Sequence, residues 1–110
     1  MKLIIGGYAQ GKTEYAKKMY PDAKVWNHFH IWVETFLEEH TVEELHQYVD
    51  EAIKSHKNLV IISDEIGNGI VPMEEKIRFV REQTGRVLCK IAEQAEEVVR
   101  VTCGIPQKIK

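Results

Sequence analysis

The segment Gly6–Thr13 constrains the fold of this chain more than any other. It reads Gly-Gly-Tyr-Ala-Gln-Gly-Lys-Thr and matches the Walker A pattern, Gly-x-x-x-x-Gly-Lys-Ser/Thr. The β-branched run Lys2–Ile5 precedes it, and residues 12–20, rich in helix formers, follow it up to Pro21. A buried strand, a glycine-rich loop and a helix in this order favour a parallel α/β sheet. The alternative is a plain strand-to-helix turn that carries a surface lysine.

The residue types of this Walker A segment suit phosphate binding. Its glycines let the backbone curve so that several N–H groups converge on one phosphate, and the start of the next helix adds the positive end of its dipole. We expect Lys12 to contact the β- and γ-phosphates of ATP or GTP and the Thr13 hydroxyl to bind Mg²⁺. The expected nucleotide-binding residues are Gly6, Gly7, Tyr8, Ala9, Gln10, Gly11, Lys12 and Thr13.

The rest of the chain continues the alternation of strands and helices. Apolar runs predict short strands at 2–5, 23–27, 59–62 and 98–101. Helical spacing predicts helices at 12–20, 42–56 and 73–95, with an amphipathic turn pattern at 30–39. Thr41 and Glu44 form a capping box, Gly85 is expected to break or bend its helix, and 104–106 to turn the chain into a tail. We therefore expect an α/β, P-loop NTPase-like, three-layer fold with a short, mostly parallel sheet, as a single nucleotide-binding domain over residues 1–110.

Length, net charge and cysteine content limit the kinds of partner and the cellular location that we expect for this protein. The chain has 110 residues and a formal net charge of -2, which does not favour nucleic acid binding. No apolar run approaches the roughly 20 residues that span a bilayer. Cys89 and Cys103 form neither a Cys-x-x-Cys pair nor the spacing of a zinc site. We therefore expect two reduced, partly buried thiols in a cytoplasmic protein. A domain this small, with three aromatic residues close together, has reason to form a homo-oligomer.

Ser63-Asp64-Glu65 is the second candidate for chemistry. It follows the predicted strand 59–62, and ligands of parallel sheets bind at the carboxyl ends of the strands. A carboxylate there can bind Mg²⁺ or accept a proton, and we assign Asp64 to the metal and Glu65, with Lys12, to catalysis. Two solvent-exposed acids are an equally good interpretation of the segment taken alone. The two side chains should point to opposite sides of an extended chain.

His28 and His30 would share one face of an extended segment and could contact a metal or a phosphate. Surface histidines are the preferred interpretation, because two imidazoles alone fall short of a zinc site. For Trp26, Phe29 and Trp32 we prefer packing in the core or at an interface over an apolar wall for a base or a substrate ring.

Three segments resemble the bifunctional adenosylcobinamide kinase/adenosylcobinamide-phosphate guanylyltransferase family. The first is Ser63–Pro72, which is similar to the family run Thr/Ser-Asn/Asp-Glu-Val-Gly-x-Gly-Ile-Val-Pro. The others are Thr84–Val87, similar to Ala-Gly-Arg-Val, and Cys103–Lys110, similar to Ser-Gly-Ile-x-x-Lys-Ile-Lys. The Walker A segment is similar too, although Gln10 stands where the family has serine.

The resemblance implies nucleotide triphosphate and Mg²⁺ binding, a cobinamide-type substrate of cobalamin biosynthesis, and oligomers. It also favours a functional Glu65 and Gly67–Gly69 loop. Family members are longer, and none of the five histidines here stands in the context of the family's nucleotide-accepting histidine, so we expect phosphoryl transfer to an alcohol without guanylyl transfer. The alternatives are a non-catalytic nucleotide-binding module, regulatory or for assembly, and a nucleotide-free structural remnant.

Overall fold

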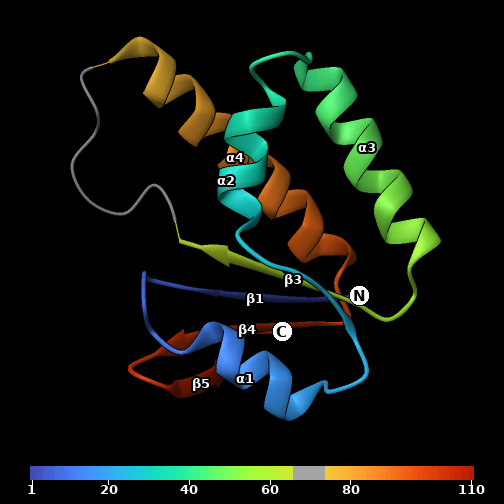
Figure 1. The fold of residues 1–110 in the computed structure, drawn as a ribbon, viewed down its shortest axis with the longest axis vertical. Helices are drawn as coiled ribbons and strands as arrows, with labels where there is room; N and C mark the ends of the chain where they lie inside the picture. Colours follow the sequence, from blue (N-terminus) through green and yellow to red (C-terminus); the bar gives the residue numbers. More distant parts are fainter. Residues whose placement is uncertain (66–73) are drawn as a thin grey trace.

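The computed structural model describes residues 1–65 and 74–110, and its strands form one five-stranded sheet in the order β2-β3-β1-β4-β5 (Figure 1). The strands are β1 Lys2–Gly6, β2 Lys24–Trp26, β3 Leu59–Asp64, β4 Glu97–Thr102 and β5 Ile105–Lys108. The helices are α1 Lys12–Met19, α2 Phe29–Phe36, α3 Val42–Ser55 and α4 Glu75–Gln94. This architecture confirms the predicted α/β, P-loop NTPase-like fold with a mostly parallel sheet.

The sheet is parallel except for its last strand. Strand β1 lies at the centre and pairs in parallel with β3 on one side and β4 on the other, so that Ile5 is opposite both Ser63 and Arg100. Strand β2 pairs in parallel with β3, while β5 runs antiparallel to β4. The carboxyl ends of β1 and β3 therefore meet at one edge of the sheet, where ligands of such folds bind.

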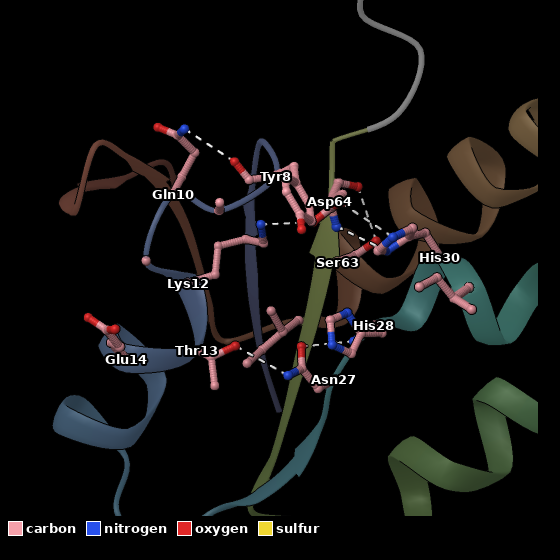
Figure 2. Close-up of a pocket in the computed structure, with 14 residues that line it drawn as sticks. Tyr8, Gln10, Lys12, Thr13, Glu14, Asn27, His28, His30, Ser63 and Asp64 are labelled. Carbon is pink, nitrogen blue, oxygen red and sulfur yellow. Dashed lines mark hydrogen bonds and ion pairs between the residues drawn. The ribbon is translucent and has the colours of Figure 1, made fainter.

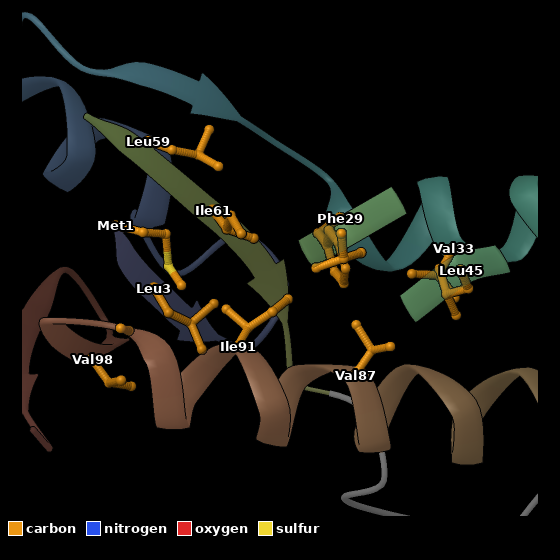
Figure 3. Packing of buried hydrophobic residues seen from close by; sticks show 12 residues of the cluster. Met1, Leu3, Phe29, Val33, Leu45, Leu59, Ile61, Val87, Ile91 and Val98 are labelled. Atoms are coloured by element: carbon orange, nitrogen blue, oxygen red, sulfur yellow. The ribbon is translucent and has the colours of Figure 1, made fainter. Parts of the chain in front are cut away.

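Helices cover both faces of the sheet (Figure 1). Helix α1 packs on one face, where Ala16 is buried against side chains of β1, β3 and β4. Helices α2, α3 and α4 cover the other face and enclose the larger core, in which Phe29, Leu45 and Ile91 are completely buried (Figure 3). Three layers follow from strands that are apolar on both faces.

Two local sequence signals concern the two longest helices: a capping box at the start of α3 and a glycine inside α4. The predicted capping box is present, because Thr41 Oγ1 accepts from the Glu44 N–H at 3.1 Å and Glu44 Oε1 accepts from the Thr41 N–H at 3.0 Å. Helix α4 runs through Gly85 without interruption, so the expected break there is wrong. Apart from the backbone of its own helix, no atom of the described residues lies within 4 Å of a Cβ placed on Gly85.

Two further expectations are wrong. The tail after Gly104 is strand β5, which makes the sheet five strands wide where about four were expected. Cys89 and Cys103 are exposed, because Cys89 lies on the outer side of α4 and Cys103 in the turn before β5. In the described part of the chain, no helix is long and apolar enough to cross a membrane.

Candidate functional site

The Walker A segment connects the central strand β1 to α1 across the carboxyl edge of the sheet. Gly11 has φ +92°, a conformation that glycine adopts without strain. A Cβ on Gly6 would lie 2.4 Å from the carbonyl oxygen of Val101, so only glycine lets the loop leave β1 this close to β4. Two of the predicted glycines are therefore required by the backbone itself.

The loop presents unpaired backbone donors. Within residues 1–65 and 74–110, none of the N–H groups of residues 8–13 donates a hydrogen bond to a protein acceptor. A run of free donors at a helix N-terminus is the usual geometry for binding an anion. The backbone of the loop is thus suited to a phosphate.

Lys12 is the charged centre of the site. Its side chain is only 8% exposed, and its Nζ lies 2.8 Å from Asp64 Oδ1 (Figure 2). The same Nζ donates to the Gly7 carbonyl at 2.5 Å. The lysine at the first turn of α1 therefore reaches back across the loop to the end of β3. The two predicted functional residues Lys12 and Asp64 are brought together.

His30, on the first turn of α2, contacts Asp64 from the opposite side (Figure 2). Its Nε2 lies 3.3 Å from Asp64 Oδ2, and its Nδ1 lies 3.3 Å from the Asp64 backbone nitrogen. Burial lowers the pKa of His30 below its ordinary value, although the Asp64 charge acts in the other direction. A neutral His30 leaves Lys12 as the cation that compensates Asp64 at neutral pH.

Thr13 is held by a residue that the sequence did not single out. Asn27, just after β2, donates from Nδ2 to Thr13 Oγ1 at 3.2 Å and accepts the His28 N–H at 2.8 Å (Figure 2). His28 has φ +53°, and this bend turns the chain from β2 into α2. Thr13 and Asp64 supply oxygen atoms, the ligand type that Mg²⁺ prefers together with water and phosphate.

These side chains line one cavity of about 490 Å³. Its walls are residues 8–14 of the Walker A segment and α1, residues 27–28 and 30–31 at the start of α2, and Ile62, Ser63 and Asp64 of β3. Cavities of this size hold small-molecule ligands and cofactors. Of the predicted cofactor-binding residues, Tyr8–Thr13 line the cavity, whereas Gly6 and Gly7 are not among its described lining residues.

Glu65 lies apart from this group. Its Oε1 accepts from Arg100 Nε at 2.5 Å, and Glu65 is not among the described residues that line the cavity. Alternation along β3 puts Asp64 on the α1 side of the sheet, whereas Glu65 shares the other face with Arg100 and Ile5. The predicted separation of the two acids is confirmed. The Gly67–Gly69 loop lies outside the described residues.

The histidines and aromatic residues divide between cavity and core. His28 and His30 both line the cavity, but no three His, Cys, Asp or Glu residues gather as a metal site in the described part of the chain. Trp26, Phe29 and Trp32 pack against one another, with ring centroids 4.7–5.7 Å apart, and Phe29 is completely buried. Packing was the preferred interpretation for the three rings, and it is confirmed.

Comparison with known proteins assigns the chain to a family. The model of the cobinamide kinase/cobinamide phosphate guanyltransferase family matches residues 22–109. The chain belongs to this family. The match begins after the Walker A segment, so the sequence pattern and the geometry of residues 6–13 support nucleotide binding separately from it.

Two curated relatives of the cobinamide kinase family are similar to the chain. The bifunctional adenosylcobalamin biosynthesis protein CobU of Salmonella typhimurium is 42% identical over 52 residues, which is 47% of this chain and 29% of the relative. The protein of the same name from Escherichia coli is 32% identical over 79 residues, 72% of this chain and 44% of the relative. The chain therefore spans less than half the length of these two relatives.

Proposed function

We propose that the cavity binds ATP or GTP with Mg²⁺ and that the chain transfers the terminal phosphoryl group to the hydroxyl of a cobinamide-type alcohol. One observation carries the proposal: the unpaired N–H groups of residues 8–13 and the Lys12–Asp64 ion pair border the same cavity. Membership of the cobinamide kinase family supports the substrate class, and the names of the two relatives are consistent with it.

Lys12 has the central role in binding. Its Nζ is placed beside the loop by the Gly7 carbonyl and Asp64. A phosphate on the loop offers this ammonium an anionic oxygen in place of the neutral carbonyl of Gly7, and hydrogen bonds between charged groups are the stronger ones. Lys12 then stabilises the negative charge on the group in transfer.

Thr13 and Asp64 are the proposed Mg²⁺ ligands. Asn27 orients the Thr13 hydroxyl, and Lys12 and His30 hold the Asp64 carboxylate at the cavity wall. A bound Mg²⁺ neutralises phosphate charge. Mg²⁺ usually keeps several waters and takes only one or two protein ligands, so two oxygen-bearing side chains are sufficient.

In the transfer, the hydroxyl oxygen of the alcohol forms a bond to the γ-phosphorus. The bond from that phosphorus to the β,γ-bridging oxygen breaks, and the nucleoside diphosphate leaves with the electron pair. We assign the hydroxyl proton to the carboxylate of Glu65, which Arg100 holds at the same sheet edge as Asp64 but on the other face, so in this proposal the alcohol approaches the γ-phosphate from that face. Guanylyl transfer is outside this proposal, because no histidine stands in the family's nucleotide-accepting context.

The test is incubation of the chain with adenosylcobinamide, Mg²⁺ and ATP or GTP, followed by mass spectrometry. We expect a phosphate ester with wild type and with Lys17→Met, a control that removes an exposed lysine of the same helix. Lys12→Met should give no ester. Nucleotide binding without any ester from wild type would reject the kinase and favour a non-catalytic nucleotide-binding module.

A further inference from the structure

The turn between β4 and β5 touches the Walker A segment from outside the cavity. Cys103 and Gly104 form a two-residue turn between the paired residues Thr102 and Ile105. Both have positive φ, 52° and 75°, as a type I′ turn requires. The N–H groups of the two central residues of such a turn have no partner within the hairpin, so they are free to donate elsewhere.

Gln10 accepts the hydrogen bonds of both N–H groups. Its side-chain Oε1 accepts from the Cys103 N–H at 2.6 Å, and its backbone oxygen accepts from the Gly104 N–H at 2.8 Å. The side-chain Nε2 donates back to the Tyr8 carbonyl at 3.2 Å. Three polar groups of Gln10 are thus engaged in fixing the loop, while its own N–H is among the unpaired donors of residues 8–13.

The loop and the turn are also in close contact. A Cβ on Gly11 would lie 3.4 Å from the Cα of Gly104 and 4.0 Å from Cγ1 of Val101. Both glycines have positive φ, +92° at Gly11 and +75° at Gly104, so the two backbones adopt without strain the conformations in which the Gln10 hydrogen bonds form. Neither Cys103 nor Gly104 is among the described residues that line the cavity, so the turn supports the loop from behind.

We infer that Gln10 is a positioning residue that ties the Walker A segment to the β4–β5 turn and so preorganises its N–H groups for the triphosphate. This inference rests on the proposed nucleotide binding. A loop already held in its binding conformation loses less conformational entropy when the ligand binds. A side chain that reaches from loop to turn adds restraint that serine, too short to do so, would not supply.

The test compares Gln10→Met with Gln107→Met. Methionine keeps the length of glutamine without its amide, and Gln107 is an exposed residue of β5. Titration calorimetry with Mg-ATP and Mg-GTP should show a Kd raised about tenfold by Gln10→Met, because binding must then also order the loop, and no change for Gln107→Met. The urea midpoint of the ligand-free protein should stay close to that of wild type.

Hydrogen exchange supplies a readout specific to the tie. The Cys103 amide should exchange faster in Gln10→Met and in Gln10→Ser, but not in Gln107→Met. Equal nucleotide affinity in wild type and both Gln10 variants would overturn the inference and leave the proposed function intact. Failure of wild type to bind either nucleotide would overturn both.

Discussion

Lys12 and Asp64 are 52 positions apart in the sequence, yet Lys12 Nζ lies 2.8 Å from Asp64 Oδ1. The pair joins the first turn of α1 to the end of β3, and parallel pairing of β1 with β3 sets this proximity because Gly6 is opposite Asp64. The ion pair therefore follows from the topology of the sheet. It places the proposed phosphate-binding cation beside the proposed metal-binding carboxylate.

Asp64→Asn tests the metal assignment. We expect this change to weaken nucleotide binding in Mg²⁺ at least about tenfold, because a metal-binding carboxylate is lost. Binding in EDTA should stay equal or tighten, since Lys12 is no longer paired with a carboxylate. Calorimetry with and without Mg²⁺ measures both, with Asp22→Asn as an exposed control. If Asp64→Asn had the same ratio of affinity in Mg²⁺ to affinity in EDTA as wild type, Asp64 would not be a metal ligand.

Glu65→Gln tests the assigned proton acceptor. The nucleotide Kd should remain that of wild type, because Glu65 is outside the described cavity lining, whereas ester formation should fall about 100-fold or more. Arg100→Met is the companion variant, since it removes the partner that holds Glu65. Wild-type turnover in Glu65→Gln would show that another group accepts the proton.

Gly6→Ala and Gly85→Ala should have opposite effects on stability. The new methyl group at position 6 meets the Val101 carbonyl at 2.4 Å, so we expect a loss of about 1–3 kcal/mol. Position 85 lies inside α4, and a methyl group there meets no atom of the described residues within 4 Å apart from the backbone of its own helix. Because alanine is the better helix former, a gain in stability of about 0.5–1 kcal/mol is expected. Urea unfolding followed by tryptophan fluorescence measures both. Equal stability of Gly6→Ala and wild type would contradict the packing described here.

Asp50 and Lys90 link α3 to α4 and should make stability depend on pH. Lys90 Nζ donates to Asp50 Oδ2 at 2.7 Å, and this hydrogen bond lowers the pKa of Asp50 below its ordinary value. A lowered pKa in the folded state stabilises the fold above the unfolded pKa of about 3.9, and that contribution disappears as pH falls through the folded pKa.

Lys90→Met should therefore cost about 0.2–1 kcal/mol at pH 7, a range reduced by solvent because both side chains are about a third exposed. The cost should shrink as pH is lowered from about 3.9 through the folded pKa of Asp50. Both proteins, with Lys90 and with Met at position 90, should also carry His46→Gln. Burial and Lys90 lower the pKa of His46 as well, so its titration would otherwise add to the pH dependence. Urea unfolding at neutral pH and at pH values below about 3.9 measures the change, and a cost independent of pH would exclude the ion pair.

Patterns local in the sequence predicted most of the fold. The apolar run of β3 and the Thr41–Glu44 capping box each carry their own signal, and the structure has both elements. Strand β5 has no such signal, because an exposed edge strand with Pro106 needs no apolar alternation. Its pairing with β4 depends on the turn at Cys103 and Gly104, whereas the sequence alone predicted only that residues 104–106 turn the chain into a tail.

The sequence predicted those residues of the candidate site that belong to a motif or follow a predicted strand. Lys12 and Thr13 follow from the Walker A pattern, and Asp64 from its place at a strand end. Asn27 was missed, and His30 was interpreted as a surface residue, because their contacts depend on the bend at His28 that starts α2. Gln10 was included only as a member of the motif, since its partner Cys103 is 93 positions away.

The most direct test of nucleotide binding is calorimetric titration of wild type and Lys12→Met with Mg-ATP and Mg-GTP. We predict one site per chain in wild type for at least one nucleotide, and a Kd at least about 100-fold higher in Lys12→Met, because the buried cation that meets the phosphates is gone. Lys17→Met should bind as wild type does. Absence of binding to both nucleotides by folded wild-type protein, or equal affinity in Lys12→Met, would contradict the proposed site.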